Sequence, residues 1–231
     1  MFKNVIVFPI GSYEYHGTLL PAETDALIAE NVSAGLCKNI KNARLLPVLN
    51  YGISTEHSDF DTTITVKSES YFRFMMELLE SIGSENTLIV IVNGHGGNVN
   101  ILNAIESEYN YLHQTSKVFC PPTYGRPAQD MAERLLGEFD THAGSTEASL
   151  VAYYNDLEKY ETTNSRFIKK MSGSLRFFRT EEVNPDGVIK DTDKLIMDPG
   201  VGEQLHVQMV DTLTNEVQDV LKDLNRINDH A

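Results

Sequence analysis

Two short stretches of the chain consist almost entirely of apolar residues, many of them β-branched, and they restrict the fold more than any other feature. Residues 4–10 read NVIVFPI and residues 87–92 read TLIVIV, without alternation of apolar and polar positions. Strands of this kind are buried on both faces, as in a parallel sheet with helices on each side. The two stretches therefore predict the centre of such a sheet.

Segments with helical periodicity alternate with the predicted strands. Apolar residues recur at helical spacing over 24–40, where Thr24 or Asp25 is the expected N-cap, and over 68–82, where a serine is the expected cap. The other expected strands are 44–49, 64–66 and 117–120, and the other expected helices are 98–113, 128–138, 144–155 and 201–226. Residues 156–200 show few periodic signals. This alternation predicts one α/β domain, residues 1–231, with three α/β/α layers and a mostly parallel sheet.

Composition excludes several classes of function. The formal net charge is −14, which disfavours nucleic acid as a partner because phosphate binding needs a basic surface. No apolar run approaches the roughly 20 residues that span a bilayer, and the N-terminus lacks the apolar core of a signal peptide. Cys37 and Cys120 form neither a disulfide framework nor a CxxC pair, so we expect a cytoplasmic protein with a small-molecule substrate.

The first strand is followed by GSYEYHGTLLPAETD, residues 11–25, which is rich in metal-binding side chains. Glu14 and His16 are two positions apart and point to the same side of an extended segment, while Asp25 starts the next helix. In parallel α/β sheets, ligands bind beyond the carboxyl ends of the strands, where this segment lies. A purely structural interpretation is also open: Asp25 caps the helix, His16 stabilises a turn and Glu14 faces solvent.

A second polar segment, NGHGGN at residues 93–98, follows the strand at 87–92 directly. Its glycines allow close approach of a ligand, and His95 is then a candidate metal ligand or catalytic residue. The alternative is a phosphate-binding loop before a helix. However, the segment contains neither GxxxxGK[ST] nor a complete GxGxxG.

A third segment, DTHAGSTEAS at residues 140–149, places Glu147 five residues after His142. If a helix begins near Gly144, both side chains can reach one pocket. The alternative is a helix cap with a surface glutamate. The chain contains no GxSxG motif, so a serine hydrolase is not indicated. Neither cysteine lies in a sequence context typical of a catalytic nucleophile.

Together these segments resemble the motifs of the creatininase (creatinine amidohydrolase) family. GSYEYHGTLLPAETD, EHSDFDTTITV, NGHGGN and THAGSTEAS occur in the family's order, and DPGVGEQL at 198–205 resembles a degraded form of its C-terminal segment. The resemblance implies a single α/β domain with a two-metal hydrolase site. It also implies metal ligands at Glu14, His16, Asp25 and His95, with Asp25 bridging the ions. His142 would be the acid/base at the leaving nitrogen, and Glu147 an acidic residue of the same pocket.

The sequence departs from creatininase at two points. Creatininase has a metal-binding glutamate where this chain has Gly97, so either the second metal has lost one ligand or Glu147 replaces it. The chain also lacks tryptophan, whereas creatininase uses tryptophans around its substrate, and this argues against creatinine. Carboxylates and imidazoles suit two divalent ions of Zn, Mn or Fe.

The expected reaction is hydrolysis of a non-peptide C–N bond, in a cyclic amide or a formamide, by hydroxide generated at the metal pair. Gly96, Gly97, Asn98 and His57 are expected to contact the substrate, with Glu56 beside His57.

Different branches of this family act on different substrates. The short chain without tryptophan resembles the branch that deformylates a formylaminopyrimidine ribonucleotide in flavin and deazaflavin biosynthesis, and Arg126 is a candidate contact for its phosphate. Another branch trims a modified peptide during mycofactocin maturation. A non-catalytic metal- or nucleotide-binding module is the alternative from another functional class. The resemblance further implies a homo-oligomer, commonly a hexamer.

Overall fold

The computed structural model of the protein describes residues 1–140, 142–171, 175 and 177–228. Its centre is a sheet of four parallel strands in the order β2-β1-β3-β4. The strands are β1 (Asn4–Ile10), β2 (Ala43–Leu45), β3 (Thr87–Asn93) and β4 (Ser116–Phe119). β1 and β3 pair from Asn4–Thr87 to Ile10–Asn93. The predicted parallel sheet is therefore confirmed, with the two most apolar stretches at its centre.

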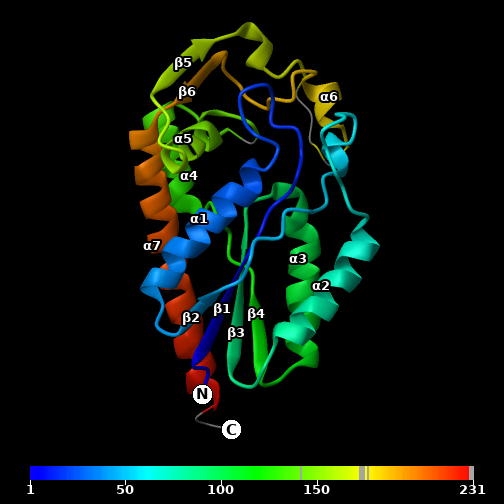
Figure 1. Cartoon of the computed structure of the whole chain (residues 1–231), viewed down its shortest axis with the longest axis vertical. Helices are drawn as coiled ribbons and strands as arrows, with labels where there is room; N and C mark the ends of the chain where they lie inside the picture. Colours follow the sequence, from blue (N-terminus) through cyan, green and yellow to red (C-terminus); the bar gives the residue numbers. More distant parts are fainter. Residues whose placement is uncertain (141, 172–174, 176, 229–231) are drawn as a thin grey trace.

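Helices cover both faces of this sheet (Figure 1). One face carries α1 (Thr24–Asn39), α4 (Arg126–Leu136), α5 (Ser145–Tyr154) and α7 (Pro199–Asn228), and the other carries α2 (Ser68–Ile82) and α3 (Val99–Leu112). Along β1, Val5 and Val7 pack in the core of the first face, whereas Ile6 and Phe8 pack in the core of the second. The predicted α/β/α layering follows from this alternation, because each strand buries both of its faces.

Several predicted boundaries were wrong. β2 ends at Leu45, before Pro47, which lacks the N–H that a strand ladder needs. The expected strand at 64–66 consists only of isolated bridges, Tyr13–Ile64 and Gly52–Thr65. The expected caps also fail: Glu23 is the N-cap residue of α1 and Lys67 that of α2, neither with a side-chain capping bond.

The described part of residues 156–200, a region with few periodic signals, includes a two-stranded sheet that packs against α5. β5 (Tyr160–Thr163) and β6 (Lys194–Met197) pair in antiparallel fashion, and α6 (Thr180–Val183) lies between them in the chain. Leu195 and Met197 pack with α5 in a third hydrophobic cluster. Three short 3-10 helices complete the described structure: η1 (Thr55–His57), η2 (Gly96–Asn98) and η3 (Ser165–Phe167).

The start of α1 crosses directly over the carboxyl ends of β1 and β3. A Cβ atom at Gly94, the residue after β3, would lie closer than 3.0 Å to the backbone carbonyl of Asp25. Glycine at this position therefore allows the helix to approach the strand end. This approach places the Asp25 side chain between the loops that follow the two strands. Among the described residues, no helix is long and apolar enough to cross a membrane.

Candidate metal centre

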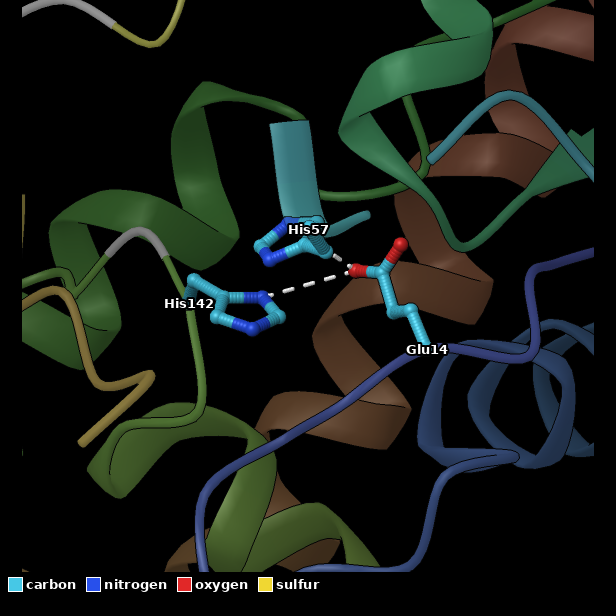
Figure 2. A group of neighbouring side chains, drawn as sticks. All are labelled: Glu14, His57 and His142. Atoms are coloured by element: carbon cyan, nitrogen blue, oxygen red, sulfur yellow. Dashed lines mark ion pairs between the residues drawn. The ribbon is translucent and has the colours of Figure 1, made fainter. Parts of the chain in front are cut away.

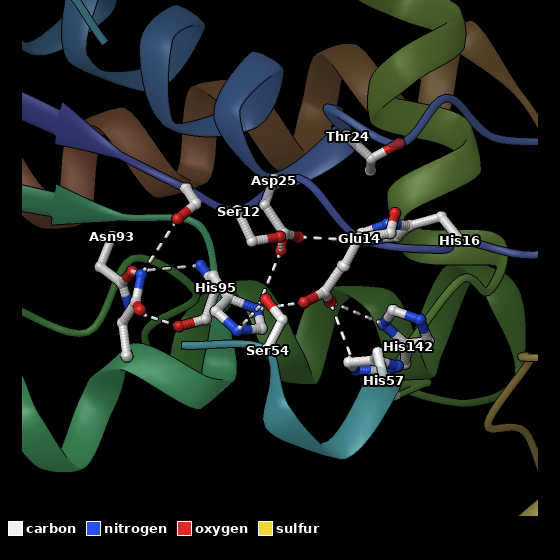
Figure 3. A network of polar contacts seen from close by, with 12 residues as sticks. Ser12, Glu14, His16, Thr24, Asp25, Ser54, His57, Asn93, His95 and His142 are labelled. Atoms are coloured by element: carbon white, nitrogen blue, oxygen red, sulfur yellow. Dashed lines mark hydrogen bonds and ion pairs between the residues drawn. The ribbon is translucent and has the colours of Figure 1, made fainter. Parts of the chain in front are cut away.

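Seven polar side chains meet at this edge of the sheet, and Figure 3 labels all of them except Glu147. They are Glu14, His16, Asp25, His57, His95, His142 and Glu147. Glu14, His16 and Asp25 are at most 2% exposed. Burying several ionisable groups together costs free energy unless they are paired or bind a cation. The structure thus brings together the residues that the sequence singled out at 14, 16, 25, 95, 142 and 147.

Asp25 lies at the middle of the group. Its Oδ1 is 3.2 Å from His16 Nε2, its Oδ2 is 3.0 Å from His95 Nδ1, and Ser12 donates a hydrogen bond of 2.7 Å to Oδ2. Burial alone would raise the pKa of this carboxyl, but the two histidines hold it well below its usual range. Asp25 is therefore an anion that divides its two oxygens between two histidines.

Backbone carbonyls fix the orientation of three histidines. The contacts are His16 Nδ1 to Glu14 O (3.1 Å), His95 Nε2 to Ile53 O (2.8 Å) and His142 Nε2 to Tyr15 O (2.9 Å). Because a carbonyl oxygen only accepts hydrogen bonds, the nitrogen facing it must carry a hydrogen. When such a ring is neutral, its opposite nitrogen carries a lone pair that is available to a metal ion. Histidines that bind metal ions are held in this way.

The ligand atoms form three groups whose members lie within 4.8 Å of one another. The groups are Glu14–Asp25–His95, His16–His142–Glu147 and Glu14–His57–His142. Glu14 Oε2 is buried and accepts no hydrogen bond in the described structure, and it lies 3.3 Å from His95 Nδ1. Burial would lower the pKa of His16 and His95, yet the nearby carboxylates raise both, that of His16 to about 10. The carboxylates therefore require positive charge here, and the donor set fits divalent cations.

Glu147 reaches the group from the first turn of α5. Its Oε2 accepts a 2.7 Å hydrogen bond from Ala143 N and lies 3.9 Å from His16 Nε2. Burial raises the pKa of Glu147. Ala143 has φ = 53°, an unusual value for a residue other than glycine, and this bend separates His142 from the helix. Thr141, in the same sequence motif, lies outside the described residues.

A buried ion pair supports the start of α5 from behind. Asp140 accepts hydrogen bonds from the backbone N–H groups of Ser145 and Thr146, and Lys190 Nζ lies 3.1 Å from Asp140 Oδ2. Lys190 is 2% exposed and also pairs with Glu138. Nothing in the sequence of the 156–200 region indicated this lysine.

His57 and His142 share one oxygen of Glu14 (Figure 2). Glu14 Oε1 lies 3.3 Å from His57 Nε2 and 3.6 Å from His142 Nδ1, and the two ring centroids are 4.1 Å apart. Burial and the neighbouring histidines lower the pKa of each ring to about 3. Sequence reasoning predicted a substrate contact for His57 and missed its contact with Glu14, for which the neighbouring motif EHSDF was the only signal.

A cavity of about 730 Å³ opens over the group. Gly96, Gly97, Glu56 and His57 line it, whereas Asn98, also expected to contact the substrate, does not. Asn98 accepts a hydrogen bond from Ile53 N (2.9 Å) and donates one to Gly11 O (3.1 Å), so it joins loops behind the cavity. Arg126 does not line the cavity either, since its exposed side chain pairs with Asp130 at 2.7 Å.

Known proteins resemble this chain over nearly its whole length. The mycofactocin precursor peptide peptidase of Mycobacterium ulcerans (strain Agy99) is 28% identical over 225 residues, covering 92% of this chain and 84% of the relative. The 2-amino-5-formylamino-6-ribosylaminopyrimidin-4(3H)-one 5'-monophosphate deformylase of Methanocaldococcus infernus is 24% identical over 224 residues, covering 93% of this chain and 91% of the relative.

Solved structures and a family profile also match this chain over most of its length. A creatininase with Mn superposes with a TM-score of 0.72 at 19% identity, covering 94% of this chain and 91% of that one. At 19% identity, this structural similarity shows that the two proteins share a fold. The profile of the family described as creatinine amidohydrolase matches residues 2–217. The protein therefore belongs to the creatininase family.

Proposed function

We propose that this creatininase-family amidohydrolase hydrolyses a cyclic amide or a formamide with two divalent metal ions. The observation that carries the proposal is the buried group of carboxylates and carbonyl-held histidines at the floor of the cavity. Such a group has no role in packing and is costly to bury without cations. A non-catalytic binding module would not need His142, whose Nδ1 faces the same group.

The distances support two proposed sets of ligands, the second of which takes Asp25 in place of the nearby His142. Glu14, Asp25 and His95 would hold one ion, and His16, Asp25 and Glu147 the other, so that Asp25 bridges them. Glu147 then takes the place of the glutamate that is absent at Gly97. When bound, Zn, Mn or Fe ions would polarise the scissile carbonyl and lower the pKa of a water molecule to about 7.

His142 is proposed to move the proton that the leaving nitrogen needs. Its Nε2–H is fixed on Tyr15 O, so Nδ1 is the atom that takes up and releases the proton. Gly96 and Gly97 line the cavity, where their backbone N–H groups would orient the carbonyl oxygen of the substrate. His57 would hold Glu14 in place through Oε1 and leave Oε2 for the ion.

A formylaminopyrimidine ribonucleotide is a second candidate substrate, favoured by the 24% identity to the deformylase. Its phosphate would need a cation, yet no lysine or arginine occurs among the described residues that line the cavity. The 28% identity to peptidases supports a peptide-derived amide as a further substrate to assay. Both cysteines are free, in keeping with a cytoplasmic location. We also propose that the protein forms a homo-oligomer, a hexamer by family resemblance.

The first experiment is elemental analysis of protein purified without chelators or a metal-affinity tag. About two equivalents of Zn, Mn or Fe per chain are expected. The loaded protein is then assayed for release of formate or amine from formamides, cyclic amides and short peptide amides. Turnover that EDTA abolishes would support the proposal. No metal after reconstitution, or two bound ions with no turnover of any compound, would contradict it.

A further inference from the structure

Glu56 differs from the other carboxylates that line the cavity because it has no partner among the described residues. Histidines face three of the others, which are Glu14, Asp25 and Glu147. Lys190 pairs with the remaining one, Asp140. Glu56 makes no ion pair or hydrogen bond with another described residue, and its polar contact is with its own backbone N–H. The cavity thus contains one carboxylate that is free to bind a ligand.

The carboxylate of Glu56 is accessible from the cavity. Glu56 lies in η1, directly before His57, and the residue is only partly buried. Neither of its oxygens belongs to the buried side-chain atoms that lack a hydrogen-bond partner in the described structure. A ligand in the cavity can therefore contact this carboxylate directly.

Glu56 lies beside His95 but outside the proposed metal centre. The chain at η1 runs next to the turn that precedes α3 (Figure 3), and a Cβ atom at Gly97 would lie closer than 3.0 Å both to Glu56 Oε1 and to His95 Nε2. His95 faces Asp25 and Glu14 with its other nitrogen, Nδ1. The carboxylate of Glu56 is therefore near the Nε2 edge of the ring, and it belongs to none of the groups of possible metal ligands.

The balance of charge around the cavity indicates what Glu56 binds. Glu14, Asp25 and Glu147 would face the proposed metal ions, which offset their charge. The charge of Asp140 is offset by Lys190. No lysine or arginine of the described residues lines the cavity, so nothing in its described lining offsets the charge of Glu56. This charge attracts a cationic group of a ligand and repels an anionic one.

Two carboxamides line the cavity on the helix that follows Gly97. Asn100 is three residues after Gly97 and Asn103 is three residues further on, so the two side chains lie on one face of α3. Both residues are exposed, and neither side chain makes a hydrogen bond within the described structure. An ammonium group has three N–H donors, and carboxamide oxygens accept hydrogen bonds as carboxylates do. This wall of the cavity thus offers one charged and two neutral acceptors.

Building on the proposed hydrolase function, we propose that Glu56 is a specificity-determining residue that binds a protonated amine of the substrate. The amine donates to the Glu56 carboxylate, and the carboxamide oxygens of Asn100 and Asn103 accept its remaining hydrogen bonds. The substrate is then an amide or formamide that carries a positively charged amine a few bonds from the scissile carbonyl. A neutral compound of the same shape is a poorer substrate.

The first test measures binding to the metal-loaded protein, which does not depend on turnover. The probes are two pairs of metal-chelating compounds that differ only by an ammonium or a methyl group. One pair is β-alanine hydroxamate and butyrohydroxamic acid, and the other is N-(2-aminoethyl)-N-hydroxyformamide and N-hydroxy-N-propylformamide. By isothermal titration calorimetry, the wild type should bind the charged member of at least one pair about tenfold more tightly. The absence of a preference in both pairs would overturn the proposal.

The variants show whether Glu56 is the origin of this preference. Glu56→Gln keeps the size of the side chain and should abolish the preference for the charged probe, with unchanged metal content. Asp61→Asn is the matched control, because it removes the same charge from an exposed residue of the same loop that does not line the cavity. It should keep the preference. Loss of metal from Glu56→Gln, or equal loss of preference in both variants, would overturn the proposal.

The second test measures turnover with the same design. The substrate pairs are β-alaninamide with butyramide and N-(2-aminoethyl)formamide with N-propylformamide, so that the amine lies on either side of the scissile bond. Glu56→Gln should lower kcat/KM about tenfold for the charged member of the preferred pair and leave that of its neutral partner unchanged. An equal fall for both members would show that Glu56 supports the reaction in general and does not select a cation.

The outcomes separate this inference from the proposed function. If the wild type hydrolyses no amide but Glu56→Gln still abolishes the preference for a charged probe, the hydrolase assignment fails and the role of Glu56 stands. If the wild type turns over amides without any preference for a charged amine, the role of Glu56 is wrong and the hydrolase stands.

Discussion

Asp25 and His16, nine positions apart in the chain, meet with Oδ1 3.2 Å from Nε2, and this contact leaves the second oxygen of Asp25 for another partner. That partner is His95, with Nδ1 3.0 Å from Oδ2. One carboxylate therefore joins the loop after β1 to the loop after β3. The arrangement makes Asp25 the residue on which both proposed metal positions depend.

Replacement of Asp25 by asparagine tests this dependence. The amide preserves the shape of the side chain but removes its charge, so we expect both ions to be lost, whereas loss of a non-bridging ligand would affect mainly one. Elemental analysis of Asp25→Asn beside wild type measures the effect, and Glu23→Gln, an exposed change two residues earlier, is the control. Retention of two ions by Asp25→Asn would exclude the bridging role.

His142 lies close enough to His16 and Glu147 to be a ligand, although we propose that it moves a proton. For His142→Ala we expect unchanged metal content and a fall in kcat of about 10²–10⁴-fold, the usual contribution of general acid–base catalysis. Metal analysis and kinetics on one preparation separate the two roles. Loss of one equivalent of metal would identify His142 as a ligand.

The main features of the fold were predictable because they depend on local pattern. The runs at 4–10 and 87–92 predicted central strands, and their carboxyl ends predicted where Glu14 and His95 would meet. Other features depend on contacts between distant segments. The distance from His57 to Glu14 is set by the path of the loop at 50–60, and Asn98 joins loops through its own amide, which no local pattern reveals. Lys190 is buried through contacts with the distant residues Glu138, Asp140 and Ser145.

Gly97 is predicted to tolerate no side chain. A Cβ atom there would lie closer than 3.0 Å to Ile53 O and His95 Nε2, a separation that real Cβ atoms do not show. Gly97→Ala should therefore displace His95, reduce metal content and lower the free energy of unfolding by about 1–3 kcal/mol. At Gly96 a Cβ atom meets nothing within 4 Å, so Gly96→Ala is the matched control. Equal behaviour of the two variants would contradict the packing around residue 97.

Lys190 is predicted to be essential for stability because its partner Asp140 is buried with it. In Lys190→Met the carboxylate of Asp140 loses its cation, which for a buried pair costs about 3–5 kcal/mol. Lys159→Met removes an exposed ion pair with Asp198 and should change stability far less, because solvent screens that pair. Urea denaturation of both variants measures the difference. Similar losses of unfolding free energy in the two variants would show that the buried carboxylate of Asp140 does not need Lys190 as its cation.

Glu138, the second partner of Lys190, should give the ion pair a specific pH dependence. Burial alone would raise the pKa of Glu138, but hydrogen bonds from Lys190 and Thr192 lower it below its usual value. The unfolded chain therefore binds the proton more readily, and the stabilisation is fully present above the unfolded pKa of about 4.3 and is lost as pH falls through the lower folded pKa. Glu138→Gln should destabilise the protein by about 1 kcal/mol at about pH 7, and the difference should shrink below about pH 4. Urea denaturation at both pH values measures this, with Glu161→Gln, in the exposed pair with Lys194, as control. A difference that stays constant down to about pH 3 would show that charge on Glu138 does not stabilise the fold.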